Sequence, residues 1–69
     1  MSDDIRLNVF YDIKKGDDTF HYLETCAYPD AISTIKRIIE KGAFCINYDV
    51  YKRSEGEKMY IFAGNVKVK

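Results

Sequence analysis

The sequence predicts an α+β domain: a four-stranded sheet with one helix on one face. Four segments alternate apolar and polar residues with a period of two, which is typical of strands with one buried side. Between the second and the third of them, residues 28–43 repeat isoleucine at helical spacing. The element order is therefore β-β-α-β-β, and one helix can cover only one face of such a sheet. A chain of 69 residues is short enough to form a single domain, predicted over residues 1–69.

The first hairpin is predicted from residues 5–13 and 18–26, joined by the turn KKGDD. One side of the first strand is apolar along its length and carries Ile5, Leu7, Val9, Tyr11 and Ile13. A turn centred on the Lys-Gly pair sets Tyr11 opposite Phe20, and apolar pairs of this kind fix the register of a hairpin. Glu24 is the one charged residue among the apolar pairs of this hairpin, because this register sets it opposite an apolar residue.

The helix is predicted within residues 28–43, YPDAISTIKRIIEKGA. Pro29 is tolerated in a first turn, Asp30 suits the positive end of the helix dipole, and Gly42 suits the position after the last turn. The apolar stripe consists of Ala31, Ile32, Ile35, Ile38 and Ile39. We expect Ile35 and Ile38 to be buried, because isoleucine is a poor helix former without packing. The residues expected to bury them are Val9, Tyr22, Tyr48 and Ile61.

The second hairpin is predicted from residues 43–53 and 58–63, with a turn at SEGE. The side chains expected to point toward the helix are Phe44, Ile46, Tyr48, Val50, Met59 and Ile61. Those expected to point away from it are Tyr51, Tyr60 and Phe62. Gly64 inside the run indicates a bulge, past which NVKVK continues the strand.

Two hairpins flanking one helix, with an ending that reads YIFAG at residues 60–64, resemble the β-grasp arrangement of small immunoglobulin-binding bacterial domains. The resemblance covers the element order over most of the chain and residue identity at a few positions. It implies the sheet order 2-1-4-3, in which the first and last strands are central and parallel and a helical crossover links the two hairpins.

The charges are divided unevenly along a chain that has no net charge. Residues 1–35 hold three basic and seven acidic residues, a net charge of −4, and residues 36–69 hold eight basic and four acidic residues, a net charge of +4. A nucleic-acid-binding domain is usually basic overall, so this balance weighs against one. The alternative it leaves open is a single-stranded nucleic-acid-binding module that stacks bases on sheet aromatics. Its basic residues would be Lys36, Arg37, Lys52, Arg53 and Lys58.

The sequence does not predict an enzyme, because its chemically active residues are not placed to form a catalytic group or a metal site. His21 is the only histidine, and Cys26, five residues further along the same strand, faces the other side, roughly 17 Å away at about 3.3 Å per residue. One histidine and two isolated cysteines cannot supply the four ligands of a structural zinc site. Phosphate-binding and nucleophile motifs are missing from the sequence. We therefore expect no cofactor, no metal and no small-molecule substrate.

Two cysteines, Cys26 and Cys45, are few for a disulfide scaffold and indicate a reducing cytoplasm. We expect both to be free, small, buried hydrophobic residues, with Cys26 facing the core, and a single bridge between them is the alternative. The apolar runs are shorter than the roughly 18 residues of a membrane span, which predicts no membrane partner. The opening MSDDIRLNVF lacks the features of a signal peptide.

The uncovered face of the sheet is the predicted functional surface. With the order 2-1-4-3, Phe10, Tyr51, Tyr60 and Phe62 form one aromatic stripe on it. Aromatic residues are enriched at interfaces, so the stripe predicts a small non-catalytic protein-binding domain, an inhibitor, adaptor or accessory factor of bacterial or phage type. Its partner would be another protein or a second copy in a homodimer. The competing interpretation is that the rings only reinforce the sheet through cross-strand pairs such as Tyr51–Tyr60.

Overall fold

A computed structural model describes residues 4–69, and these residues form the predicted α+β domain. The prediction of four strands and one helix in the order β-β-α-β-β is confirmed. The elements are β1 (Asp4–Lys15), β2 (Asp18–Ala27), the short 3-10 helix η1 (Tyr28–Asp30), α1 (Ala31–Glu40), β3 (Phe44–Arg53) and β4 (Ile61–Lys67). Within this part of the chain, no helix has the length and apolar character needed to cross a membrane.

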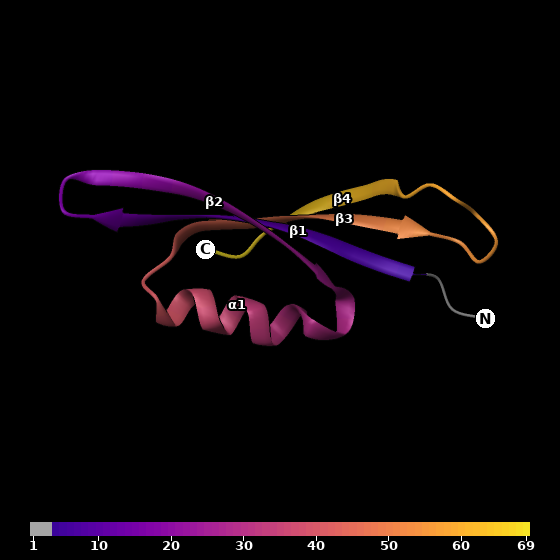
Figure 1. Ribbon diagram of the computed structural model, residues 1–69, viewed down its shortest axis with the longest axis horizontal. Coiled ribbons are helices and arrows are strands. Elements are labelled where there is room, and N and C mark those ends of the chain that lie inside the picture. Colours follow the sequence, from indigo (N-terminus) through magenta and orange to yellow (C-terminus); the bar gives the residue numbers. More distant parts are fainter. Residues whose placement is uncertain (1–3) are drawn as a thin grey trace.

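The sheet order is β2-β1-β3-β4, and every neighbouring pair is antiparallel (Figure 1). The expected β-grasp-like order 2-1-4-3, with β1 and β4 central and parallel, is therefore wrong. The central partner of β1 is β3, and the edge strands are β2 and β4. The two hairpins consequently lie side by side through β1 and β3.

The composition of the last two strands explains why β3 takes the central place. β3 has ten residues and sets Val50 and Tyr48 opposite Leu7 and Val9, so both strands contribute apolar pairs to the helix side of the sheet. β4 has seven residues and contains Gly64, which has no side chain to pack and weakens a central strand. The longer apolar strand therefore gains more from two neighbours.

The first hairpin has a register two residues away from the predicted one. Tyr11 lies opposite Tyr22 instead of Phe20, and Lys15 pairs with Asp18 across the turn. The turn residue Gly16 has a φ of 63°, a conformation that glycine adopts without strain. Because strand side chains alternate with a period of two, a shift of two residues keeps every side chain on its predicted side.

The core lies between α1 and the middle of the sheet. Its buried members are Leu7, Val9, Tyr11, Ile38, Ala43 and Ile46. Ile38 is 0% exposed, and Ile35 is half-buried. Tyr22 and Tyr48 are partly buried against the core, as predicted. The helix has ten residues and spans about 15 Å, against a molecule 47 Å long, so it covers only the centre of its face.

Glu24, the discordant residue of the sequence pattern, connects β2 to the helix. It lies opposite Val9 on the helix side, where the Tyr11 hydroxyl donates a 2.6 Å hydrogen bond to Oε2. The Arg37 guanidinium donates a second bond to Oε1. These two hydrogen bonds, that of Tyr11 foremost, lower the pKa of Glu24. Burial, together with the Glu24 carboxylate, raises the pKa of Tyr11 to about 12.

The second hairpin departs furthest from its predicted form. β4 begins at Ile61, so residues 54–60 form a loop in place of a tight turn, and the register shift beside Gly64 confirms the predicted bulge. The helix does not cover β4, and Met59 and Ile61 are exposed. The expectation that both point into the core, and that Ile61 covers the helix, is therefore wrong.

A second bulge lies at the start of β3. Cys45 has a φ of 53°, and the pairing with β1 skips one residue there, so that Phe44 lies opposite Asp12. Because cross-strand partners share a side, the bulge moves Phe44 to the helix-free face, opposite to its predicted side. Both cysteines are free thiols: Cys26 is half-buried against the core, whereas Cys45 is exposed and not buried as expected.

Candidate functional site on the helix-free face

The pairing of the strands arranges the helix-free face in rows that run across the sheet. Asp4 and Arg53 lie nearest the 54–60 loop, and the first row that crosses all four strands contains Ala27, Arg6, Tyr51 and Phe62. The next row contains Thr25, Asn8, Asp49 and Asn65, and the third contains Leu23, Phe10, Asn47 and Lys67. Aromatic, polar and mixed rows thus follow one another along the strands.

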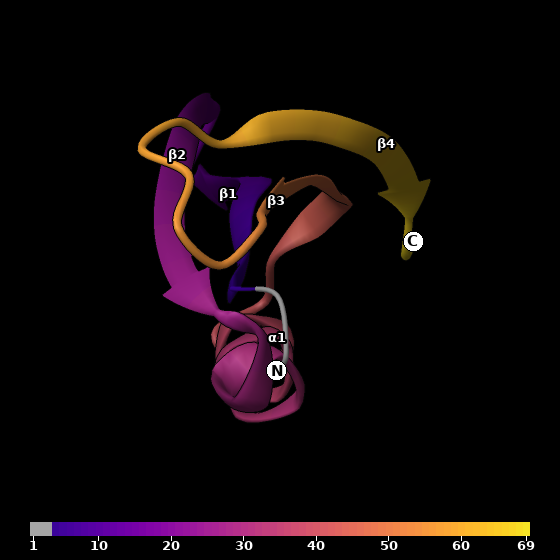
Figure 2. The same cartoon turned by 90° about the vertical axis from the view of Figure 1, so that its right-hand side faces the viewer.

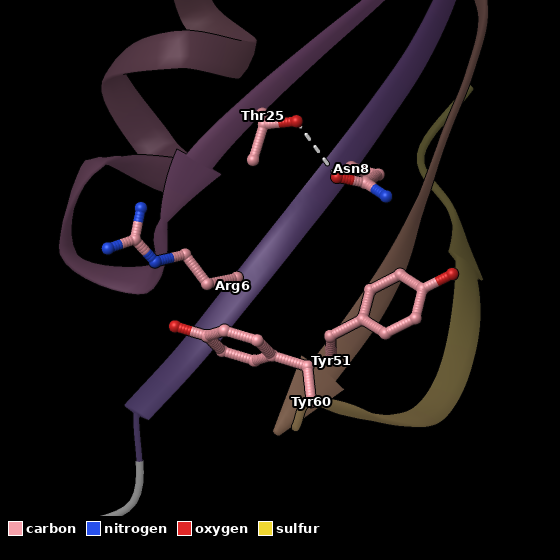
Figure 3. Close-up of a pocket in the computed structure, with 5 residues that line it drawn as sticks. All are labelled: Arg6, Asn8, Thr25, Tyr51 and Tyr60. Atoms are coloured by element: carbon pink, nitrogen blue, oxygen red, sulfur yellow. Dashed lines mark hydrogen bonds between the residues drawn. The ribbon is translucent and has the colours of Figure 1, made fainter. Parts of the chain in front are cut away.

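The aromatic end of this face joins two strands and the loop. Tyr51 on β3 and Phe62 on β4 meet edge to face, with ring centroids 5.7 Å apart and planes at 68°. Figure 3 shows Tyr60 extending from the loop across β1 to the side of Arg6. The edge-to-face contact of Tyr51 and Phe62 is an arrangement that aromatic rings prefer, and it leaves Phe62 56% exposed.

Asp4 holds Tyr60 in this position. The Tyr60 hydroxyl donates a hydrogen bond to Oδ2 of Asp4, and Arg53 donates a 3.1 Å bond to the same oxygen. The Arg53 guanidinium also lies 4.9 Å from the centre of the Tyr60 ring, within cation–π distance. The bond from Tyr60, followed by the charges of Arg6 and Arg53, lowers the pKa of Asp4. At neutral pH the carboxylate is therefore ionised and keeps the loop against β1.

A shallow hollow of about 520 Å³ opens between the two tyrosines (Figure 3). It is lined by Arg6, Asn8, Thr25, Tyr51 and Tyr60. Thr25 donates a 2.9 Å hydrogen bond to the side-chain oxygen of Asn8 and closes one side. Arg6 forms another side of the hollow, and its guanidinium lies 3.9 Å from a carboxylate oxygen of Asp4. Such a hollow suits a protruding side chain of a partner.

A polar row separates Phe10 from the aromatic end. Asn65 donates hydrogen bonds to Asp49 at 2.8 Å and to Asn47 at 3.1 Å, continuing the row of Thr25 and Asn8. Phe10 lies beyond it, beside Leu23 on β2. The predicted stripe is therefore divided: the structure brings together Tyr51, Tyr60 and Phe62 and leaves Phe10 apart. The division follows from the sheet order, because β3 lies between β1 and β4.

Two apolar residues of this face were not part of the predicted stripe. Leu23 is exposed beside Phe10, and Phe44 reaches the same face through the bulge at Cys45. Alternation along the strands places Leu23 and Arg6 on this face, but only the folded loop brings Tyr60 next to Arg6 and forms the hollow. A bulge that lacks glycine, such as the one that moves Phe44, leaves no signal in the sequence.

The five basic residues of the nucleic-acid alternative are not brought together. Arg37 is bound to Glu24 on the helix side, and Arg53 is bound to Asp4 on the opposite face. Lys36 is on the helix, Lys52 lies on β3 opposite Ile5 on the helix side, and Lys58 lies in the loop. The charges of Arg37 and Arg53 are thus already neutralised by carboxylates. The set forms no continuous basic surface beside the aromatic rings.

The other chemically active residues stay dispersed. The His21 ring lies 2.6 Å from an Asp12 carboxylate oxygen on the helix-free face, whereas Cys26 packs on the helix side. Among residues 4–69, His, Cys, Asp and Glu side chains do not gather in any group of three that could hold a metal. Comparisons with known protein families, curated proteins and solved structures find no match, so the function has to be argued from the geometry of the site.

Proposed function

We propose that this chain is a small non-catalytic protein-binding domain that acts through the helix-free face of its sheet. The observation that carries the proposal is the aromatic end of this face, where Tyr51 and Tyr60 line a hollow together with Arg6, and Phe62 packs edge to face on Tyr51. Tyrosine and arginine are the residue types enriched at the energetic centres of protein interfaces. A side chain of the partner would enter the hollow, and Phe62 would pack beside it.

The rest of the face supports the same function. The hydrogen-bonded row of Thr25, Asn8, Asp49 and Asn65 offers polar groups beyond the hollow, and Phe10 with Leu23 forms a second apolar patch past it. A polar rim around an apolar centre is the usual organisation of an interface. In this role the chain would serve as an inhibitor, adaptor or accessory factor of bacterial or phage type in the cytoplasm.

A protein partner explains the site better than a single-stranded nucleic acid. Stacking platforms bind nucleic acid together with a basic groove that follows the backbone. Here Arg53 is held by Asp4, and Asp49 lies in the next row of the face. Carboxylates this close to the rings would repel a phosphate backbone, whereas a protein partner can pair with them.

The test is capture of a partner by immobilised chain, with and without nuclease, comparing the parent with the double variant Tyr60→Ser/Phe62→Ser. We expect a protein to be retained after nuclease treatment, and the double variant to bind it at least tenfold more weakly. The matched control is Tyr28→Ser, which removes an exposed aromatic ring outside the face and should bind as the parent does. Circular dichroism confirms that each variant keeps its helix.

Two results would contradict the proposal. Equal binding by the parent and the double variant would mean that the rings of Tyr60 and Phe62 only stabilise the sheet. Capture that disappears with nuclease and weakens steeply with added salt would instead assign the face to nucleic acid.

A further inference from the structure

The helix side of the sheet is covered over only one half. Figure 2 shows α1 lying beneath β1 with β2 on one flank, while β4 curves away on the other. The ion pair between Arg37 and Glu24 fixes which flank of the helix faces β2. The opposite flank therefore faces the side of the molecule on which β4 ends.

That opposite flank of α1 is apolar and exposed. Ile32 is 82% exposed and Ile39 is 39% exposed, and together with Ile35 they line a shallow hollow of about 430 Å³. Lys36 and Glu40 lie at its margin. At about 100° per residue, Ile32 and Ile39 lie on the same side of the helix, roughly a third of a turn from the buried Ile38. The helix thus has two apolar surfaces and uses one of them in its own core.

The uncovered half of the sheet is apolar as well. Ile61 lies opposite Lys52 and Val66 lies opposite Tyr48, and both partners belong to the helix side of β3. Ile61 is nevertheless 71% exposed and Val66 is 42% exposed, because α1 ends its coverage before β4. The helix side of β4 and one flank of α1 are therefore two exposed apolar surfaces of the same molecule.

We propose that these two surfaces bind each other between two copies of the chain, forming a homodimer. The flank of α1 that carries Ile32 and Ile39 packs on the helix side of β4 of the second copy, at Ile61 and Val66. With two-fold symmetry, this contact between α1 and β4 forms twice, once in each direction. This is the self-complementary arrangement of an isologous dimer. In each copy the helix of the other completes the layer that its own helix leaves unfinished.

The exposed apolar side chains supply about half of the area that such a dimer needs. Ile32, Ile39, Ile61 and Val66 together hold on the order of 400 Å² of exposed surface, about half of the ~800 Å² that each partner buries in a standard interface. Half-buried Tyr48 and the aliphatic stems of Lys36 and Lys52 adjoin these side chains and can supply much of the remainder. The charged heads of the two lysines would then lie at the rim.

A second copy fits better than an unrelated partner because the chain itself supplies both halves of the contact. Ile38 of α1 already packs on the helix side of β1 and β3, so a second apolar flank of the same helix type suits the same face of β4. This dimer does not depend on the proposed function, since the aromatic hollow opens on the other face of the sheet. The domain could therefore bind a partner protein as a dimer.

The test measures self-association by sedimentation equilibrium from about 1 µM to 0.5 mM. We expect the parent to dimerise with a dissociation constant at or below about 100 µM. Ile32→Glu and Val66→Lys should each weaken the dimer at least tenfold, because each places a charge in an apolar contact. The double variant Ile32→Glu/Val66→Lys should recover at least part of that loss, because the new charges meet across the two-fold interface.

The matched control is Leu23→Glu, which places the same charge at an exposed leucine of the helix-free face and should leave self-association unchanged. A parent that stays monomeric at 0.5 mM, or a dimer that Leu23→Glu weakens as much as Ile32→Glu, overturns the proposal. Single variants that dissociate while the double variant recovers nothing would show that Ile32 and Val66 do not face each other, and would overturn this arrangement. Because Ile32 is highly exposed, Ile32→Glu should not prevent folding, and circular dichroism checks that the variant keeps its helix.

Discussion

The two hairpins have opposite characters, although the sequence presents them as equivalents. The β1–β2 hairpin has a tight turn, ten consecutive cross-strand pairs and a helix bound to it through Glu24. The β3–β4 hairpin has a seven-residue loop, a bulge and an edge strand that the helix does not cover. The first hairpin, together with β3 and α1, therefore supplies most of the stability, whereas β4 and the loop before it leave apolar side chains exposed on both faces.

The difference shows where a small domain can place exposed apolar groups. Residues 61–66 contribute little to the core, so their exposed side chains can contact other molecules without unfolding the domain. The aromatic pair of each hairpin illustrates this division. Tyr11 and Tyr22 stack at 5.3 Å over the core, whereas Tyr51 and Phe62 meet at 5.7 Å on the open face.

The largest expected effect is on the helix contact with the first hairpin. Ile38→Ala should lower the free energy of unfolding by about 2–5 kcal/mol, because the side chain is fully buried and leaves a cavity. Ile32→Ala is the matched control on the same helix and should change stability by less than about 0.5 kcal/mol. Urea denaturation followed by circular dichroism measures both. Equal effects of the two variants would mean that α1 does not pack as described.

Much of this half of the fold could be predicted from the sequence. Alternation over residues 5–13 and the isoleucine spacing of the helix are long, regular signals, and they identified Val9 and Ile38 as core residues. The sheet order could not be predicted, because strands 3 and 4 both alternate and either could lie next to β1. What decided between them was the extra length of β3 and the glycine in β4, which act through packing across the whole sheet.

The second prediction concerns the contact between Tyr11 and Glu24. Tyr11→Phe should lower the free energy of unfolding by about 2 kcal/mol at neutral pH, because it removes a hydrogen bond to a charged group. The folded-state pKa of Tyr11 is raised to about 12 from an ordinary value near 10. Below pH 10 the stabilisation is complete, and it is lost as the pH rises toward 12, because the unfolded chain releases the proton first.

Stability measured from pH 8 to 12 tests this linkage. The parent should lose stability between pH 10 and 12, and the loss should be smaller in Tyr11→Phe. Tyr48→Phe is the control, since it removes a hydroxyl from the same side of the sheet without touching Glu24. If the parent and Tyr11→Phe decline in parallel, the hydroxyl of Tyr11 is not held by Glu24.

Less of the candidate site than of the core could be predicted from the sequence. Alternation put Tyr51 and Phe62 on the helix-free face, and both lie there. The hollow depends on the 54–60 loop, which carries Tyr60 across β3 to Asp4, a residue 56 positions earlier in the chain. Contacts of this separation leave no periodic signal, and neither does the bulge at Cys45 that moves Phe44.

The smallest expected effect on stability is at the open face, and it separates stability from binding. Phe62→Ser should lower the free energy of unfolding by only about 0.5–1 kcal/mol, because the ring is 56% exposed and loses one edge-to-face partner. Tyr22→Ser removes the corresponding ring of the first hairpin and should cost about 2–3 kcal/mol more, because that ring packs against the core. Denaturation curves of the two variants compare the hairpins directly. If Phe62→Ser destabilised the domain as much as Tyr22→Ser, the second hairpin would also be structural. Phe62 would then be explained by folding alone, and the aromatic end of the helix-free face would no longer support a partner.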